Sequence, residues 1–173
     1  MKIVRAPALM LMLLCLGFWY YLVQSTAGLP LRVAVLFAAN GRATGWVTRS
    51  DHLLLMGTIG IGLPIVLAFV GAVICLVSFV RANRPHPEDE RPSVECLPSG
   101  AYVFRYLIWL ACWVVCFAAA LQFFIAQANS SLPANLSVGS LLAIAVSFCA
   151  VVVVWCSKLA AALRSLRERG FLP

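Results

Sequence analysis

The side chains that could hold a metal ion or act as nucleophiles are chiefly seven cysteines and two histidines. Six cysteines fall in apolar stretches, and Cys96 lies in a polar one; the six are Cys15, Cys75, Cys112, Cys116, Cys149 and Cys156. Cys112 and Cys116 would share one helix face, but a tetrahedral thiolate site needs ligands that converge on one ion. Free cysteine is also an ordinary small apolar residue. We therefore expect no metal site.

The other polar groups give no catalytic set. A haem site would need histidine inside the helices, whereas His52 and His86 lie outside the apolar stretches. Ion-coupled transport normally requires an Asp or Glu within a membrane helix, and none interrupts these stretches. Asp51-His52 has no evident nucleophile beside it, and Gln122, the deepest strongly polar side chain, is expected to bond to a neighbouring helix. We expect no cofactor and no enzymatic activity.

The composition explains why so little chemistry is available. Of the 173 residues, 63% are apolar and 11% are charged, against about 45–50% and about 25% in soluble domains. The mean hydropathy is +0.98. These values exclude a soluble enzyme and a nucleic-acid-binding domain.

Four apolar stretches reach the length of about 20 residues that a membrane-spanning helix needs. They predict helices over about residues 6–24, 53–80, 102–127 and 136–169, in one transmembrane domain that covers 1–173. The first stretch could also be read as a signal peptide, but its length and the bulky run Phe18–Tyr21 favour a retained helix. The predicted fold is an all-α membrane protein, a four-helix transmembrane bundle with a structured external loop between its first two helices.

The basic residues set the expected orientation. Ten of the 13 Lys and Arg residues lie before the first helix, between the second and third, at the start of the third, or in the last turns of the fourth. The positive-inside rule then places both termini and loop 81–101 in the cytoplasm, and loops 25–52 and 128–135 outside. The net charge of +7 is thus a signal of topology and of contact with lipid headgroups. We expect no nucleic-acid partner.

The first external loop has the pattern of a small hairpin. Val33–Phe37 has strand character, Asn40-Gly41 favours a turn, and Gly45–Thr48 would be the returning strand. A loop that dips its apolar residues into the membrane interface fits the same pattern equally well.

Small residues mark the expected helix-packing faces. They are Gly57, Gly60 and Gly62, followed by Pro64, in the second helix, and Gly139, Ala143 and Ser147 in the fourth. Small residues allow the close backbone approach that holds helices together in lipid. Pro64 is expected to kink its helix. Ordinary packing is the favoured interpretation, and a hinge or ligand crevice is the alternative.

A series of residues in the first half of the chain follows a known family pattern. The series is Leu29-Pro30, Val33-Ala34, Phe37, Gly41, Gly45-Trp46 and Arg49, followed by Leu63-Pro64. Over about residues 10–75 it resembles a bacterial membrane domain of unknown function that also forms the N-terminal part of SdpI-type immunity and signalling proteins. The resemblance implies a four-helix, stand-alone branch of that family. Two departures are Leu36, where the family has histidine, and Thr44, where it often has an acidic or amide residue.

The sequence therefore predicts a non-enzymatic protein of the bacterial cytoplasmic membrane that acts through protein contacts. It would be an accessory subunit, an immunity factor or a signalling modulator, with a membrane-protein partner or a second copy of itself besides the lipid bilayer. The external-loop residues expected to make these contacts are Pro30, Phe37, Asn40, Gly41, Arg42, Gly45, Trp46 and Arg49. The alternatives are a small transporter or lipid-handling protein that uses a crevice near Gln122, and a pigment- or lipid-binding subunit of a larger complex.

Overall fold

The computed structural model describes residues 2–38, 40–82, 97–130 and 134–168. The helices are α1 (Lys2–Ala27), α2 (Arg49–Gly57), the π-helix η1 (Thr58–Gly62), α3 (Leu63–Ala82), α4 (Leu97–Asn129) and α5 (Val138–Glu168), and the strands are β1 (Arg32–Phe37) and β2 (Ala43–Thr48). Because α2, η1 and α3 follow one another without a break, the described chain forms four long helices and one hairpin. The predicted fold class is confirmed.

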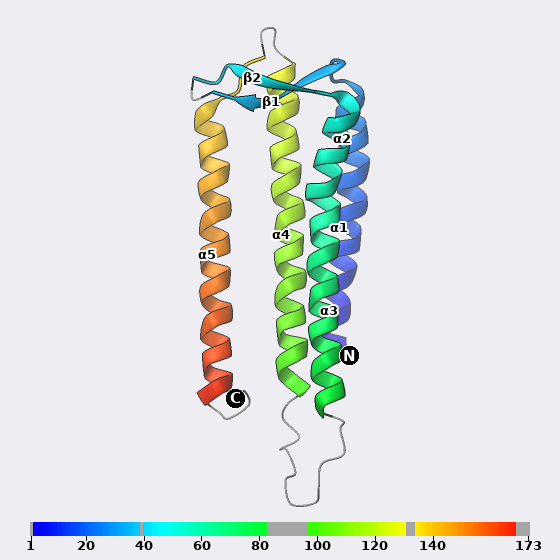
Figure 1. Ribbon diagram of the computed structural model, residues 1–173, viewed down its shortest axis with the longest axis vertical. Coiled ribbons are helices and arrows are strands. Elements are labelled where there is room, and N and C mark those ends of the chain that lie inside the picture. Colours follow the sequence, from blue (N-terminus) through cyan, green and yellow to red (C-terminus); the bar gives the residue numbers. More distant parts are fainter. Residues whose placement is uncertain (1, 39, 83–96, 131–133, 169–173) are drawn as a thin grey trace, which may run out of the picture.

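The four helices alternate in direction (Figure 1), and the hairpin lies across one end of the bundle. The first and last described residues lie at the opposite end. Three of the helices are long and apolar enough to cross a membrane, over Ala6–Ala27, Arg49–Val80 and Gly100–Asn129, and α5 contributes a shorter described apolar stretch, Ala145–Ala161. The chain is a multi-pass membrane protein.

Three helices begin earlier than the sequence analysis expects: α1 begins at Lys2 rather than at residue 6, and α2 and α4 begin early for local reasons. At α2, the Thr48 side chain accepts a hydrogen bond from the Asp51 backbone N–H at 3.2 Å, so the helix begins at Arg49. At α4, Pro98 lies in the first turn, where its missing N–H costs no hydrogen bond, so the helix begins at Leu97.

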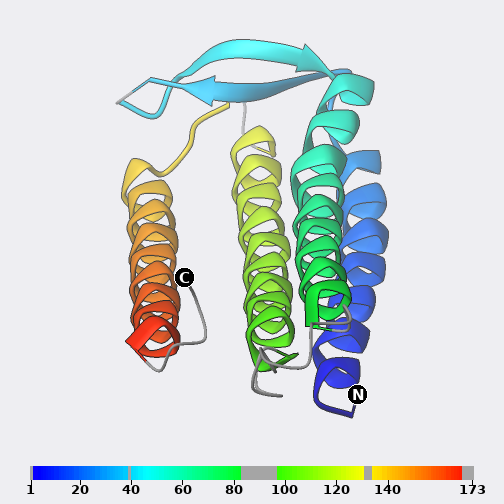
Figure 2. The ribbon, with the colours of Figure 1, turned by 60° about the horizontal axis from the view of Figure 1, so that its bottom comes forward.

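The core lies where α1, the α2–α3 run and α4 pack together, whereas α5 packs mainly against α4 (Figure 2). Glycines permit close approach of α3 and α4, because a Cβ at Gly71 would meet Phe104 and a Cβ at Gly100 would meet Ser78. The largest fully buried side chains are Leu22, Met56, Ile108, His52, Gln122, Val33, Val115 and Pro64.

The irregularity expected at Pro64 takes the form of the π-helix that precedes it. The Leu63 N–H donates to the Thr58 carbonyl, five residues back. A proline ring clashes with the carbonyl four residues before it, here that of Gly60. A wider turn at this point relieves the clash while the helix continues into α3.

Gly60 is also where the π-helix meets α1. A Cβ at Gly60 would overlap the Phe18 ring, whereas a Cβ at Gly62 would lie 3.7 Å from Thr58 Cγ2, in ordinary contact. Gly60→Ala is therefore expected to lower the free energy of unfolding by about 1–3 kcal/mol through overpacking. Thermal unfolding in detergent micelles, followed by circular dichroism, measures the effect. Gly62→Ala is the matched control, and equal melting temperatures for the two variants would contradict the contact with Phe18.

Candidate functional site: the capped end of the bundle

The loop between α1 and α2 forms an antiparallel hairpin. β1 pairs with β2 in a register that sets Val33 opposite Val47 and Ala34 opposite Trp46, with irregularities between Ala34 and Phe37. We call this hairpin, with its turn, the cap. Of the two interpretations that the sequence left open, the hairpin is confirmed.

The turn of the cap depends on Asn40 and Gly41. The Asn40 side chain accepts a hydrogen bond from the Arg42 N–H at 3.1 Å. Gly41 has φ of +81°, a backbone conformation that L residues with a side chain rarely adopt. The Gly41 carbonyl accepts from the Leu136 N–H at 3.0 Å, and a Cβ on Gly41 would overlap the Leu136 carbonyl. The turn is thus docked on the segment that leads into α5.

Asn129, the last residue of α4, holds the middle of the cap. Its Oδ1 accepts from the Ala34 N–H at 2.8 Å, and its Nδ2 donates to the Ala34 carbonyl at 3.0 Å and to the Ile125 carbonyl at 2.8 Å. The side chain is buried. In effect, one amide group takes the place of a neighbouring strand at Ala34. Asn129-Ser130-Ser131 fits the pattern of a glycosylation acceptor. However, the Asn129 amide nitrogen already donates its two hydrogen bonds within the protein.

The base of the cap is tied to the segment between α1 and β1. The Arg49 N–H donates to the Leu31 carbonyl at 3.1 Å, and the Arg49 guanidinium donates to the Leu29 carbonyl. Arg49 is half-buried and faces back into the protein, whereas Pro30 is exposed.

Beneath the cap, a chain of hydrogen bonds joins three helices. His52 Nε2 donates to Gln122 Oε1 at 2.8 Å, and Gln122 Nε2 donates to Ser25 Oγ at 2.9 Å. Ser25 Oγ in turn donates to the Leu22 carbonyl at 3.2 Å. Because an amide oxygen only accepts, His52 carries its proton on Nε2. Its Nδ1 is buried and has no hydrogen-bond partner among the described residues.

The prediction that Gln122 bonds to neighbouring helices is confirmed, and His52 is fully buried although the sequence suggested an interfacial position. Sequence reasoning missed His52 as a core residue and Asn129 as the holder of the cap. The available signal at both positions was a polar side chain at the end of an apolar stretch.

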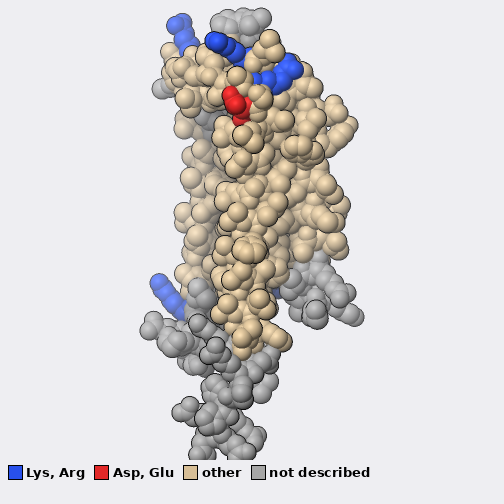
Figure 3. All heavy atoms as spheres, turned by 45° about the vertical axis from the view of Figure 1, so that its right-hand side comes forward, with Lys and Arg blue, Asp and Glu red and all other residues tan. Residues whose placement is uncertain are grey.

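The outward surface of the cap is apolar and basic. Side chains alternate along β2, with Thr44, Trp46 and Thr48 exposed. Trp46 is 51% exposed and Leu36 is 64% exposed. Arg32 and Arg42 are exposed as well, and in Figure 3 basic side chains gather over this end of the bundle while the middle of the face shown is uncharged.

The remaining residues that the sequence analysis singled out lie in different parts of the structure. Phe37 is half-buried and lines an apolar cavity of about 290 Å³ under the cap. Gly45 lies under the Leu36 side chain, and a Cβ on Gly57 would reach Trp19 at 3.9 Å. Further residues lie on α5: a Cβ on Gly139 would meet open space, and Ala143 and Ser147 line a groove facing α4.

The described residues contain no group of three or more His, Cys, Asp or Glu side chains placed to hold a metal ion. The capped end of the bundle therefore presents an apolar and basic surface that hydrogen bonds hold in place. Comparison of the chain with protein-family models, curated proteins and solved structures finds no match.

Proposed function

We propose that the chain is a non-enzymatic protein of the bacterial cytoplasmic membrane that acts through contacts of its cap with another membrane protein. The cap would face outward and both termini the cytoplasm, since ten of the 13 basic residues fall on the side of the termini. The observation that carries the proposal is a strand edge held away from the bundle.

The free edge is that of β2. The Ala34 N–H and carbonyl both bond to Asn129, so they point away from β2. In an antiparallel pair, opposite residues exchange both backbone bonds or neither. Trp46, opposite Ala34, therefore directs its own N–H and carbonyl away from β1. Within the described residues β2 has no second neighbouring strand, and in Figure 1 β1 lies nearer the helix ends.

An open strand edge is a template for an extended segment of another chain, with neighbouring side chains giving specificity. Here Trp46 and Leu36 supply apolar area, and Trp is prominent among residues that dominate binding energy. Arg32 and Arg42 flank the strands, and Asp51 is the described acidic residue at this end. The fitting partner is an extended segment with acidic and apolar residues, belonging to another membrane protein.

A photo-crosslinking residue at exposed Thr44 tests this proposal in membranes of the native cell. We expect one discrete protein adduct, and Trp46→Ala should lower its yield about tenfold or more, because the variant removes the largest apolar anchor. Phe69→Ala, which removes a 67% exposed aromatic side chain on α3, is the control and should leave the yield unchanged.

Charge provides the second arm of the experiment. Joint Arg32→Glu and Arg42→Glu substitution should abolish the adduct, because like charges would then face each other, and joint substitution to Lys should retain it. An adduct that persists after charge reversal, or one lost equally in Phe69→Ala, would overturn the proposal.

A path for a solute past Gln122 has less support. Its side chain is fully buried, and both of its polar atoms are engaged in hydrogen bonds to other helices.

A further inference from the structure

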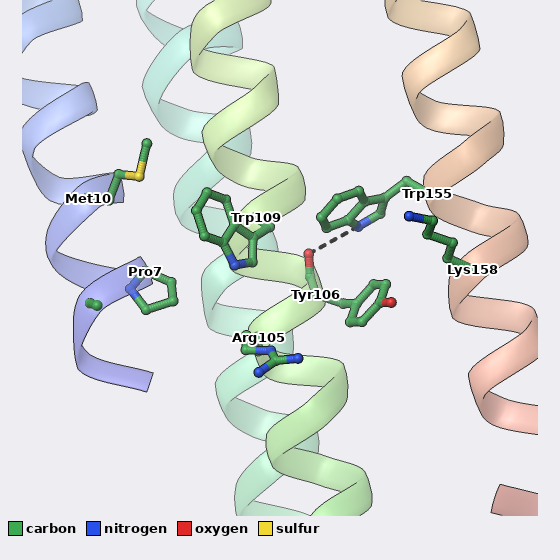
Figure 4. Close-up of a pocket in the computed structure, with 8 residues that line it drawn as sticks. Pro7, Met10, Arg105, Tyr106, Trp109, Trp155 and Lys158 are labelled. Atoms are coloured by element: carbon green, nitrogen blue, oxygen red, sulfur yellow. Dashed lines mark hydrogen bonds between the residues drawn. The ribbon is translucent and has the colours of Figure 1, made fainter. Parts of the chain in front are cut away.

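A basic and aromatic cavity lies at the end of the bundle away from the cap. α1, α4 and α5 line its volume of about 530 Å³. Arg105 and Lys158 contribute positive charge, and Tyr106, Trp109 and Trp155 contribute aromatic surface. Figure 4 shows Trp155 reaching from α5 towards α4, where its Nε1 donates to the Tyr106 carbonyl at 3.3 Å. The side chains thus converge on one space from different helices.

Among the described residues, none that lines this cavity is acidic and could balance its positive charge. The described acidic residues are Asp51, at the capped end, and Glu168, and neither lines the cavity. The Arg105 guanidinium lies 5.6 Å from the centre of the Tyr102 ring, a contact that does not neutralise its charge. Arg105 belongs to the apolar stretch Gly100–Asn129. A cation near the end of such a stretch extends its side chain to the depth of the headgroups, where an anionic group stabilises it.

An apolar groove of about 300 Å³ lies between α4 and α5. On α4, Trp113 of the groove is one helical turn from Trp109 of the cavity, and on α5, Val151 is one turn from Trp155. Along both helices, the groove therefore begins about one turn from the cavity. Its complete lining is Trp113, Cys116, Phe117, Ala120, Ala143, Ser147, Phe148 and Val151.

We infer that the cavity and the groove together bind one anionic phospholipid. Its phosphate lies between Arg105 and Lys158, and one acyl chain follows the groove between α4 and α5. Basic pockets between membrane helices suit anionic headgroups, and Trp and Tyr favour the depth of the headgroups. The cavity volume falls in the usual range for ligand sites, about 300–1,000 Å³. This site is separate from the cap and does not rest on the function proposed for it.

Purified, delipidated protein in neutral detergent, titrated with phosphatidylglycerol and read by native mass spectrometry, tests the headgroup half of the site. We expect a one-to-one adduct that binds phosphatidylglycerol more tightly than phosphatidylcholine. Joint Arg105→Gln and Lys158→Gln substitution should weaken phosphatidylglycerol about tenfold or more, because two basic contacts are lost. Joint Arg32→Gln and Arg42→Gln substitution removes the same charge at the cap and should leave binding unchanged.

The groove half is tested by filling it. Ala143→Phe, which places a ring in the groove, should weaken phosphatidylglycerol several-fold, and Val146→Phe, at a 65% exposed position outside the groove lining, should not. Circular dichroism verifies that each variant keeps its helix content.

Three results would overturn the inference. The first is equal loss of binding in the cap pair, which would mean diffuse electrostatic attraction. The second is equal affinity for phosphatidylcholine. The third is complete displacement of the lipid by millimolar inorganic phosphate together with no effect of Ala143→Phe, which would assign the cavity to a free anion.

Discussion

Replacing Asn129 with alanine is expected to release the cap from α4. The substitution leaves the Ala34 N–H and carbonyl buried without their partners, at about 1–3 kcal/mol each. The free energy of opening the cap should fall by about 2–6 kcal/mol, so the backbone amides of residues 32–48 should exchange with solvent at least about thirtyfold faster. Hydrogen exchange followed by mass spectrometry, with the protein in lipid nanodiscs, measures this change.

Two further variants sharpen the result. Asn129→Asp keeps an acceptor for the Ala34 N–H but turns a carboxylate towards the carbonyls of Ala34 and Ile125, so it should also open the cap. Ser130→Ala, which removes a neighbouring exposed hydroxyl, should leave exchange unchanged. Protection of residues 32–48 that survives Asn129→Ala would show that the turn contacts at Gly41 hold the cap without the amide.

The Asn129 variant also bears on the proposed function. If a partner recognises the cap as a fixed surface, loss of the Asn129 amide should lower the yield of the Thr44 adduct together with the protection of the cap, because a binding surface that is no longer pre-organised must be ordered on binding. An unchanged adduct with an opened cap would mean that the partner orders the cap itself.

The second large effect is expected at the polar core. Gln122→Leu leaves the His52 Nε2–H buried without an acceptor, and His52→Leu leaves the Gln122 oxygen without its donor. Each change should lower the free energy of unfolding by about 1–3 kcal/mol. Unfolding by sodium dodecyl sulfate in mixed micelles, followed by circular dichroism, measures both variants.

The double variant separates the hydrogen bond from packing. Joint His52→Leu and Gln122→Leu substitution removes donor and acceptor together, so its cost should fall short of the sum of the single costs by about 1 kcal/mol or more. Gln127→Leu, at an exposed position of the same helix, is the control and should have little effect. Strict additivity would show that the two side chains do not act as a pair.

The sequence by itself determined the class of the protein, because long uncharged apolar stretches have few alternatives in water or in lipid. The predicted stretch at 53–80 is continuous in the structure because one helix satisfies its own backbone bonds, whatever packs against it. The sequence also indicated a hairpin as one of two possibilities, since Asn40-Gly41 provides a turn between two short strand-like runs. It could not decide between a hairpin and a loop that dips into the membrane interface, because that choice depends on what the strands dock against.

Only the tertiary structure decided the roles of particular polar residues. Asn129 reads in the sequence as an ordinary residue at a helix end, and its role depends on Ala34, 95 residues away along the chain. His52 and Gln122 lie 70 residues apart and become partners only when α2 meets α4. The physical reason is that apolarity is a property of each residue, whereas a buried hydrogen bond is a property of a pair, and the fold chooses the pairs.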